Sequence, residues 1–381
     1  MKILYIANIR LPTEKAHGVQ IMKMCEAFAE LGHDVTLVVP WRTNSIKQDP
    51  FEYYNVNPLF KVRRVFSIDL IKFGKYGFLI QYFSFTVAAA LVARMSGTTL
   101  IYTRDPSLVY ACGVLGKRAV WEMHVAMWSR IQKKAAAHAK KIVVISKGLA
   151  DFYTGNGVDA QKIYIARDAA DMRDFALGES KNALRTTLEL PQDKKILSYV
   201  GKFKTIGQSK GVEEIIYAAG KLVQKDPTYF FLLVGLNEHE FPEAKAAVVD
   251  AGLPEGNYML VGHVPRSLVP AYLQASDVLV MSYPNTEHYA KMMSPLKLFE
   301  YMASGTPIVT SDLPTIREVL SEESAVLVVP DSIEALQAGI ERLINDPSLG
   351  ARLAAAALHD IKKYTWQNRA KEILSTVAKS A

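Results

Sequence analysis

Two charged residues, Lys297 and Glu300, interrupt an otherwise apolar helical pattern over residues 294–305. Apolar side chains surround this pattern nearly completely, so we expect a buried helix. Lys297 falls in the first turn, where a cation opposes the helix dipole and a bound anion would remove the conflict. Glu300 follows one turn later on the same face, where its carboxylate can accept hydrogen bonds from a vicinal diol, as on a ribose. The spacing leaves one alternative open, a local Lys–Glu ion pair on a half-exposed helix.

Residues typical of helix ends flank this pattern. Ser294 is expected as the N-cap and Pro295 as the first helical residue, where its missing N–H costs nothing. Gly305 follows the last helical residue and suits a left-handed position. The free N–H groups of Ser294, Leu296 and Lys297 would then form an anion site at the start of the helix.

Both halves of the chain alternate short apolar runs with helical patterns. Such alternation predicts right-handed βαβ units and a parallel sheet in each half. Ligands of doubly wound sheets bind outside the carboxyl ends of the strands, so two such domains would place a cleft between those ends. The expected strands span 2–7, 35–40, 62–66, 100–103, 119–124, 142–146 and 163–166 in the first half, and 196–200, 230–234, 258–261, 278–281, 308–310 and 325–329 in the second.

Charge and composition exclude several classes of protein. The net charge of +7 is carried by dispersed basic residues, which argues against a nucleic-acid partner. Cys25 and Cys112 show no metal-binding or redox spacing, which favours a reducing compartment. Met1 leads directly into a strand-like run, so we expect no signal peptide and a cytoplasmic protein.

One apolar run needs a separate interpretation. The segment 77–93 is uncharged and is flanked by Lys72, Lys75 and Arg94. It is shorter than a typical membrane span and contains polar residues, so we expect a buried or interface helix. The alternative is a surface that leans on an anionic membrane, which would make the protein peripheral on the inner face of the membrane.

The run 294–309, SPLKLFEYMASGTPIV, resembles the donor-site segment of the family 4 retaining glycosyltransferases, which have the GT-B fold. The resemblance extends over the chain through AHGVQ at 16–20, WEMH at 121–124, VVISKGL at 143–149 and YVGK at 199–202. It implies an α/β protein with two Rossmann-like doubly wound domains that face a central cleft. We expect an acceptor-side domain over 1–182 and a nucleotide-sugar domain over 183–364, with a C-terminal helix at 365–381 that packs back on the first domain.

The same resemblance implies roles for individual residues of the second half. Glu300 matches the acid that holds the ribose hydroxyls, and the backbone from Ser294 through Pro295 and Leu296 to Lys297 matches the part that meets the diphosphate. Further matches are Lys202 and Lys210, which neutralise the diphosphate, and His263 and Val264, which lie beside the base.

In the first half, Gly18 matches the glycine that lets the backbone approach the diphosphate, and His124 matches a histidine that hydrogen-bonds the donor sugar. Asp105 and Glu122 also lie near strand ends, where helix capping explains either one equally well as catalysis. The chain departs from the family pattern at Met292, where a second Glu usually contacts the donor sugar. It also has Lys202 where Arg is commoner, and a lysine cannot bind a phosphate through two parallel hydrogen bonds as an arginine does.

These matches imply a glycosyltransferase that moves a hexose-type sugar from a UDP or GDP donor to a glycan, a lipid-linked or a small-molecule acceptor with retention of configuration. The donor is a co-substrate, and no other cofactor is expected. The chain has no Asp-x-Asp or other metal-ligand spacing, so lysines would take the place of a metal ion. Two alternatives remain: a nucleotide-sugar epimerase of the same fold, and a non-catalytic partner subunit that binds nucleotide sugar.

Overall fold

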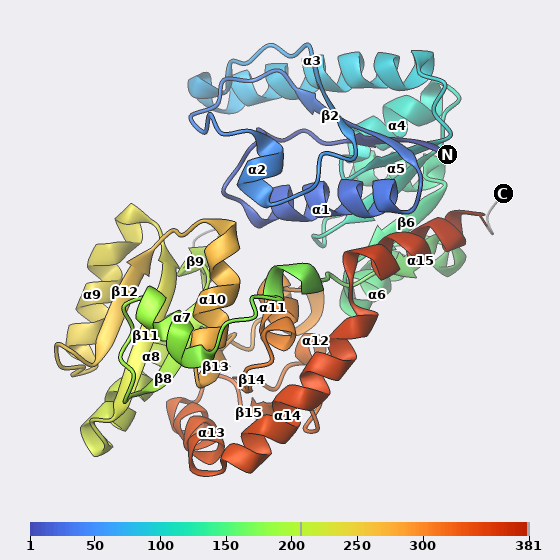
Figure 1. The fold of residues 1–381 in the computed structure, drawn as a ribbon. Helices are drawn as coiled ribbons and strands as arrows, with labels where there is room; N and C mark the ends of the chain where they lie inside the picture. The colour runs from blue at the N-terminus through green and yellow to red at the C-terminus, as the bar shows by residue number, and fades with distance from the viewer. Residues whose placement is uncertain (206–207, 379–381) are drawn as a thin grey trace. The chain divides into compact units, whose positions relative to one another are not determined.

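The computed structural model describes residues 1–205 and 208–378, and the chain forms two compact units (Figure 1). The first domain comprises Met1–Asp168 together with the C-terminal segment from Trp366, and the second comprises Ala169–Thr365. The boundary between the first and second domains therefore follows Asp168 and precedes the expected boundary at 182. The reason is that the segment after Asp168 packs on the second domain: Gln274 Nε2 donates to the Phe175 carbonyl at 2.9 Å, and Arg185 Nη2 to Asp277 at 2.6 Å.

The first domain is built on a seven-stranded parallel sheet of order β3-β2-β1-β4-β5-β6-β7. Its strands are β1 (Lys2–Ile6), β2 (Asp34–Pro40), β3 (Lys61–Val65), β4 (Leu100–Thr103), β5 (Ala119–Met123), β6 (Lys141–Val144) and β7 (Ile163–Ile165). Its helices are α1 (Ala16–Glu30), α2 (Pro50–Tyr54), α3 (Gly74–Met95), α4 (Pro106–Val114), α5 (Arg130–His138), α6 (Lys147–Gly155) and α15 (Trp366–Ala378). Helix α15 packs against α1, where Gln367 Nε2 donates to Glu30 at 2.6 Å.

The second domain repeats this plan with a six-stranded parallel sheet of order β12-β11-β8-β13-β14-β15. Its strands are β8 (Lys195–Val200), β11 (Tyr229–Leu236), β12 (Tyr258–Gly262), β13 (Val278–Met281), β14 (Ile308–Ser311) and β15 (Val326–Val328). A small antiparallel pair, β9 (Lys204–Thr205) and β10 (Gln208–Ser209), adjoins them. Its helices are α7 (Lys181–Thr187), α8 (Val212–Lys225), α9 (Phe241–Asp250), α10 (Val269–Ala275), α11 (Leu296–Ser304), α12 (Pro314–Arg317), α13 (Ile333–Asn345) and α14 (Pro347–Asp360).

The predicted fold class, two Rossmann-like parallel-sheet domains, is confirmed. The central strands are almost wholly apolar and buried on both faces, because helices cover both sides of a parallel sheet. In each sheet the strand order reverses direction next to the first strand, between β1 and β4 and between β8 and β13. Ligands of doubly wound sheets bind at this reversal, outside the carboxyl ends of the strands.

For the run 77–93, expected to be a buried or interface helix, the structure shows a helix that is buried on one face only. Helix α3 packs on α4 with one side, but only 39% of its most apolar stretch is buried. By length and composition Ile71–Met95 is long and apolar enough to cross a membrane. Tyr76 and Phe83 on the other side are 80% and 72% exposed.

Candidate functional site

Helix α11 starts at the carboxyl edge of the second sheet, after β13 and the π-helical turn His288–Met292. The predicted buried helix is confirmed, since every residue from Lys297 to Ser304 is buried and Gly305 ends it with φ +70°. The predicted start is wrong by one residue. Pro295, with an extended backbone, is the N-cap, because its carbonyl accepts the first helical bond from the Leu298 N–H at 3.0 Å. No side chain caps this end, which leaves the first-turn N–H groups available to an anion.

The Lys297 ammonium lies in this site as a buried charge. Its Nζ lies 3.5 Å from the ring centroid of Tyr199 and 5.9 Å from that of Tyr283. Across residues 1–205 and 208–378 it has no hydrogen-bond partner. Burial, and then the nearby charge of Lys210, hold the pKa of Lys297 well below its ordinary value, against the opposing effect of Glu300. A buried, unpartnered ammonium is costly unless a ligand supplies the missing negative charge.

Two glycines bring loops close to Lys297. Gly201 follows β8 with φ +149°, and a Cβ there would come within 2.7 Å of Lys297 Nζ. Gly211 precedes α8 with φ +72°, and its Cβ would meet the Ser282 carbonyl at 1.5 Å. A side chain at position 201 would therefore push its loop away from the ammonium. A side chain at position 211 would push its loop away from the end of β13.

Lys202 and Lys210 lie on these two loops, on either side of the β9–β10 pair. Burial, and then the charge of Lys202, lower the pKa of Lys210 to about 8, while Glu240 opposes the shift. Lys210 is also the main neighbouring charge that lowers the pKa of Lys297. Repulsion among these cations indicates that the unliganded site has an excess of positive charge.

Glu300 pairs with Arg266, which the sequence did not single out. The Arg266 guanidinium donates to Glu300 Oε1, and the two side chains are 26% and 9% exposed. The half-exposed Lys297–Glu300 ion pair is therefore wrong as an interpretation. Arg266 stands in the short helix Arg266–Leu268, four residues after the end of β12, where nothing in its local spacing distinguishes it from a surface residue.

The remaining second-domain candidates lie at the same edge of the sheet. His263 and Val264 directly follow β12; His263 is exposed, and Val264 packs against the core. Met292 ends the π-helical turn and is 9% exposed. The nearby tyrosines form a second feature that the sequence did not indicate: the Tyr301 hydroxyl accepts from the Val200 N–H at 2.9 Å, and Tyr289 donates to the Ser209 carbonyl at 3.0 Å.

In the first domain, Glu122 is the centre of a buried polar cluster rather than a helix cap. Asp105 is the residue that caps, accepting from the Ser107 N–H at 2.8 Å. The Glu122 carboxylate, which is fully buried, accepts hydrogen bonds from Gln20 (3.3 Å), Tyr102, Arg104 (3.2 Å), His124 (2.6 Å) and Arg369 (3.1 Å).

The electrostatics of this cluster fix the charges of its members. Burial alone would raise the pKa of Glu122, but Arg369 and Arg104 hold that pKa well below its ordinary value. Burial, and then the charge of Arg104, lower the pKa of His124 to about 4 despite Glu122. His124 is therefore a neutral imidazole at pH 7. Its Nε2–H donates to Glu122, which leaves Nδ1 as a free acceptor position.

The structure places Gly18 in the first turn of a helix. It is the third residue of α1, and a Cβ there would lie 2.2 Å from the Tyr54 hydroxyl. That hydroxyl accepts from the Thr13 N–H and donates to the Thr13 carbonyl, both at 2.7 Å. In this structure Gly18 makes room for Tyr54, which fixes the loop before α1.

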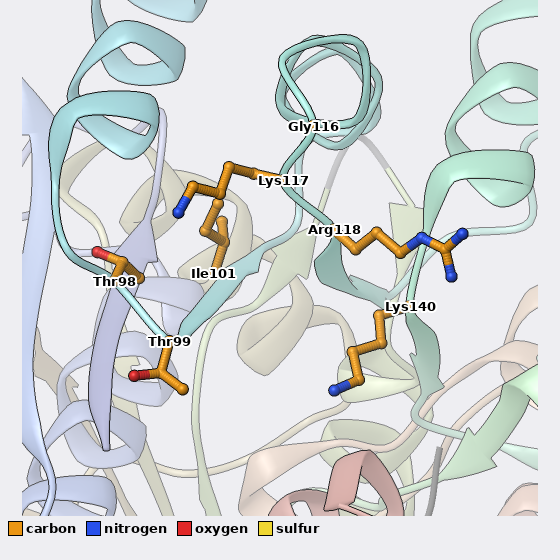
Figure 2. Close-up of a pocket in the computed structure, with 7 residues that line it drawn as sticks. All are labelled: Thr98, Thr99, Ile101, Gly116, Lys117, Arg118 and Lys140. Carbon is orange, nitrogen blue, oxygen red and sulfur yellow. The ribbon is translucent and has the colours of Figure 1, made fainter. Parts of the chain in front are cut away.

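A hollow of about 400 Å³ lies at the opposite edge of the first sheet, where β4, β5 and β6 begin (Figure 2). It is lined by Thr98, Thr99, Ile101, Gly116, Lys117, Arg118 and Lys140. His124 follows the carboxyl end of β5, so the hollow is remote from the Glu122 cluster. It shares no residue with either group of candidate site residues.

Each half of the chain is similar to a known protein family. Residues 180–360 match the family model described as glycosyl transferases group 1, and residues 17–172 match glycosyltransferase family 4. Each domain is thus similar to a glycosyltransferase family model. Solved structures of low sequence identity share the fold of the two domains, which is the GT-B fold. Examples are Anabaena Alr3699/HepE in complex with UDP and glucose (TM-score 0.76, 16% identity, 100% of both chains) and sucrose-phosphate synthase from Thermosynechococcus elongatus (0.78, 20%, 99% and 98%).

Curated glycosyltransferases are also similar in sequence. A phosphatidyl-myo-inositol mannosyltransferase of Mycolicibacterium smegmatis is 26% identical over 57% of this chain and 51% of its own length. A 2-deoxystreptamine glucosyltransferase of Streptomyces kanamyceticus is 24% identical over 76% and 71%. The match thus spans about half the length of the first of these relatives and about seven-tenths of the second.

Proposed function

We propose that the chain is a retaining glycosyltransferase that moves a hexose-type sugar from a UDP or GDP donor to a glycan, lipid-linked or small-molecule acceptor. The observation that carries the proposal is the Lys297 ammonium, which is buried and, within the described part of the chain, lacks a hydrogen-bond partner. The uncapped start of α11 and Lys210 add positive potential beside it. A diphosphate supplies the negative charge that this arrangement lacks.

The same cations would do the main catalytic work. As the bond from sugar to phosphate breaks, charge builds up on the leaving nucleoside diphosphate, and preorganised cations in a water-poor site stabilise it. Lys202, Lys210 and Lys297 take this role without requiring a metal ion. Each charge-assisted hydrogen bond to the diphosphate contributes about 1.5–3 kcal/mol.

Glu300 would hold the ribose. In the unliganded protein its Oε1 accepts from Arg266, so a ribose diol must share the carboxylate with Arg266 or displace it. His263 and Val264 at the same sheet edge would line the base. Met292 offers the donor sugar an apolar thioether where the family pattern has a carboxylate, so sugar selection would rely on other groups.

His124 would contact the sugar as a neutral hydrogen-bonding group rather than as a general acid. With its pKa near 4 it is not an imidazolium at pH 7, so it cannot serve as a general acid, and its Nδ1 accepts from a sugar hydroxyl. Retention by front-face attack, with the leaving phosphate taking the acceptor proton, needs no protein base and follows from the family resemblance. The names of the two curated relatives, a mannosyltransferase and a glucosyltransferase, support hexosyl transfer.

Donor binding and transfer test the proposal together. Thermal shift with UDP, GDP and their glucose and mannose conjugates ranks the donors, because a ligand stabilises the fold with the logarithm of its excess over Kd. Lys297→Met should abolish the shift, whereas Lys221→Met, an exposed lysine paired with Glu334, should leave it unchanged. Product analysis with donor and acceptor should show an acceptor-dependent glycoside of retained configuration. An altered sugar formed from donor alone, or binding without turnover, would overturn the transferase assignment.

A further inference from the structure

Helix α3 exposes its more apolar face, whereas an ordinary surface helix buries that face. Its outward face carries large apolar side chains at helical spacing, with Phe83 72% exposed and Leu91 50% exposed. Its inward face carries mostly small or polar residues, such as the buried Gly77, Gln81 and Ala89. Phe85 is the one large apolar side chain among the described buried residues of the helix. A surface helix of a globular protein has the reverse arrangement. The outward stripe comprises Tyr76, Leu79, Ile80, Phe83, Val87, Leu91 and Met95.

Apolar residues from neighbouring segments extend this stripe. The Ile68 N–H donates to Ser84 Oγ at 2.9 Å, which fixes the chain after β3 along the helix. Ser67 Oγ in turn donates to the Trp41 carbonyl at 2.8 Å. Ile68 and Trp41 are 41% and 69% exposed. We call the α3 stripe together with Trp41, Phe66, Ile68 and Phe73 the α3 face.

The charged residues of the segment that carries the α3 face are nearly all basic. Between residues 61 and 95 the chain has a single acidic residue, Asp69, which pairs with Arg42 at 3.6 Å. The basic residues of this segment are Lys61, Arg63, Arg64, Lys72, Lys75 and Arg94, of which Lys72, Lys75 and Arg94 flank the helix ends. Exposed apolar surface bordered by unopposed cations matches the chemistry of an anionic lipid surface.

We propose that the α3 face docks the first domain on an anionic lipid bilayer, with α3 lying in the plane of the interface. The 22-residue helix is about 33 Å long, long enough to span. Its inner side is committed to the domain, however, since Gln81 Nε2 donates to Asn8 at 3.0 Å and the helix packs on α4. A two-fold contact with a second copy would bring the same cations together, which opposes self-association. This inference goes beyond the proposed sugar transfer and does not depend on it.

Vesicle flotation of the full chain, without donor or acceptor, tests the docking. At low salt the protein should float with vesicles of phosphatidylglycerol and phosphatidylcholine, and it should not float with vesicles of phosphatidylcholine alone. The double variant Phe83→Ser/Leu91→Ser should lower the partition coefficient at least about tenfold. A matched control, Val114→Ser/Val249→Ser, removes equally exposed apolar residues elsewhere and should bind like the wild type. Lys72→Glu/Lys75→Glu should also lose about tenfold or more, unlike Lys133→Glu/Lys371→Glu.

Three results would overturn the proposal. The first is a wild-type protein that stays unbound with anionic vesicles at low salt. The second is equal binding by the α3-face variant and its control. The third is a dimer in sedimentation analysis that Phe83→Ser/Leu91→Ser dissociates, which would assign the face to a second copy. Nucleotide-induced thermal shifts, measured on the same preparations, report the donor site separately and show that the variants are folded.

Discussion

Lys297 Nζ lies 3.5 Å above the ring of Tyr199, with no hydrogen-bond acceptor for it in the described parts of the chain, 1–205 and 208–378. A desolvated cation–π contact of this kind contributes about 2 kcal/mol, less than the hydration that a buried ammonium loses. The aromatic face therefore holds the ammonium in place without neutralising it. The charge remains available to a ligand.

Replacing this ammonium should separate stability from function. Lys297→Met removes a buried charge and keeps the side-chain length, so we expect the free energy of unfolding to rise by about 1–3 kcal/mol. Donor-induced stabilisation should vanish in the same protein. Urea unfolding with and without UDP measures both effects. A Met variant that is less stable and still binds donor would show that Lys297 has a structural role only.

The pH dependence of donor binding should report Lys210. Its pKa near 8 in the free protein means that it is charged below pH 8 and neutral above it. A bound diphosphate favours the charged form, so affinity should fall as pH rises through about 8, by up to tenfold per unit. Lys210→Arg remains charged and should bind with a flatter profile between pH 7 and 9. Calorimetry at several pH values, in buffers of different ionisation enthalpy, should also detect proton uptake. Identical profiles for the two proteins would contradict this role.

Lys210 should also affect stability with a definite sign. Its folded-state pKa is depressed below the unfolded value, so the unfolded chain binds more protons between about pH 8 and 10. The free energy of unfolding should therefore rise with pH across this interval. Comparison with Lys210→Met, which has no proton to lose there, isolates the contribution, and parallel curves would refute it.

Arg266→Ala tests whether Arg266 occupies the proposed ribose site in the unliganded protein. Glu300 would lose its partner, so we expect stability to fall by about 1–3 kcal/mol. If the ribose must displace Arg266, nucleotide affinity should increase several-fold, whereas Glu300→Ala should decrease it. Titration with UDP and GDP compares the variants. Equal losses of affinity in both would identify Arg266 as a ligand of the nucleotide instead.

Glu122→Gln should be among the most destabilising single substitutions in the first domain. It removes the buried carboxylate that pairs with the Arg104 and Arg369 guanidinium groups, which costs about 3–5 kcal/mol. Because the pKa of Glu122 is depressed, its contribution is complete above the unfolded pKa near 4.3 and is lost only as pH falls further. Glu52→Gln on the exposed surface serves as control. In an Arg369→Met background, the further loss of stability caused by Glu122→Gln should be smaller than in the wild type. If the two losses simply added, Glu122 and Arg369 would not interact.

The fold could be predicted because the sequence patterns that specify it lie within single strands and helices. Apolar runs such as 196–200 and 230–234 lie within a residue or two of β8 and β11, and the helices between them force a parallel sheet. The anomalous Lys297 in an apolar helix likewise pointed to an anion site. Side-chain pairing was not predictable in this way. Arg266 meets Glu300 across 34 positions, and Arg369 meets Glu122 across 247, distances over which no periodic pattern extends.

Helix α15 has a consequence for the order in which the protein is made. The first domain is interrupted in sequence, because its residues to Asp168 are followed by the whole second domain before the chain returns at Trp366. During synthesis the second domain is therefore complete before Arg369 emerges to pair with Glu122. Until then the first domain lacks one of the two guanidinium groups that keep its buried carboxylate ionised. We therefore expect the first domain to reach its full stability only after the second domain has been made.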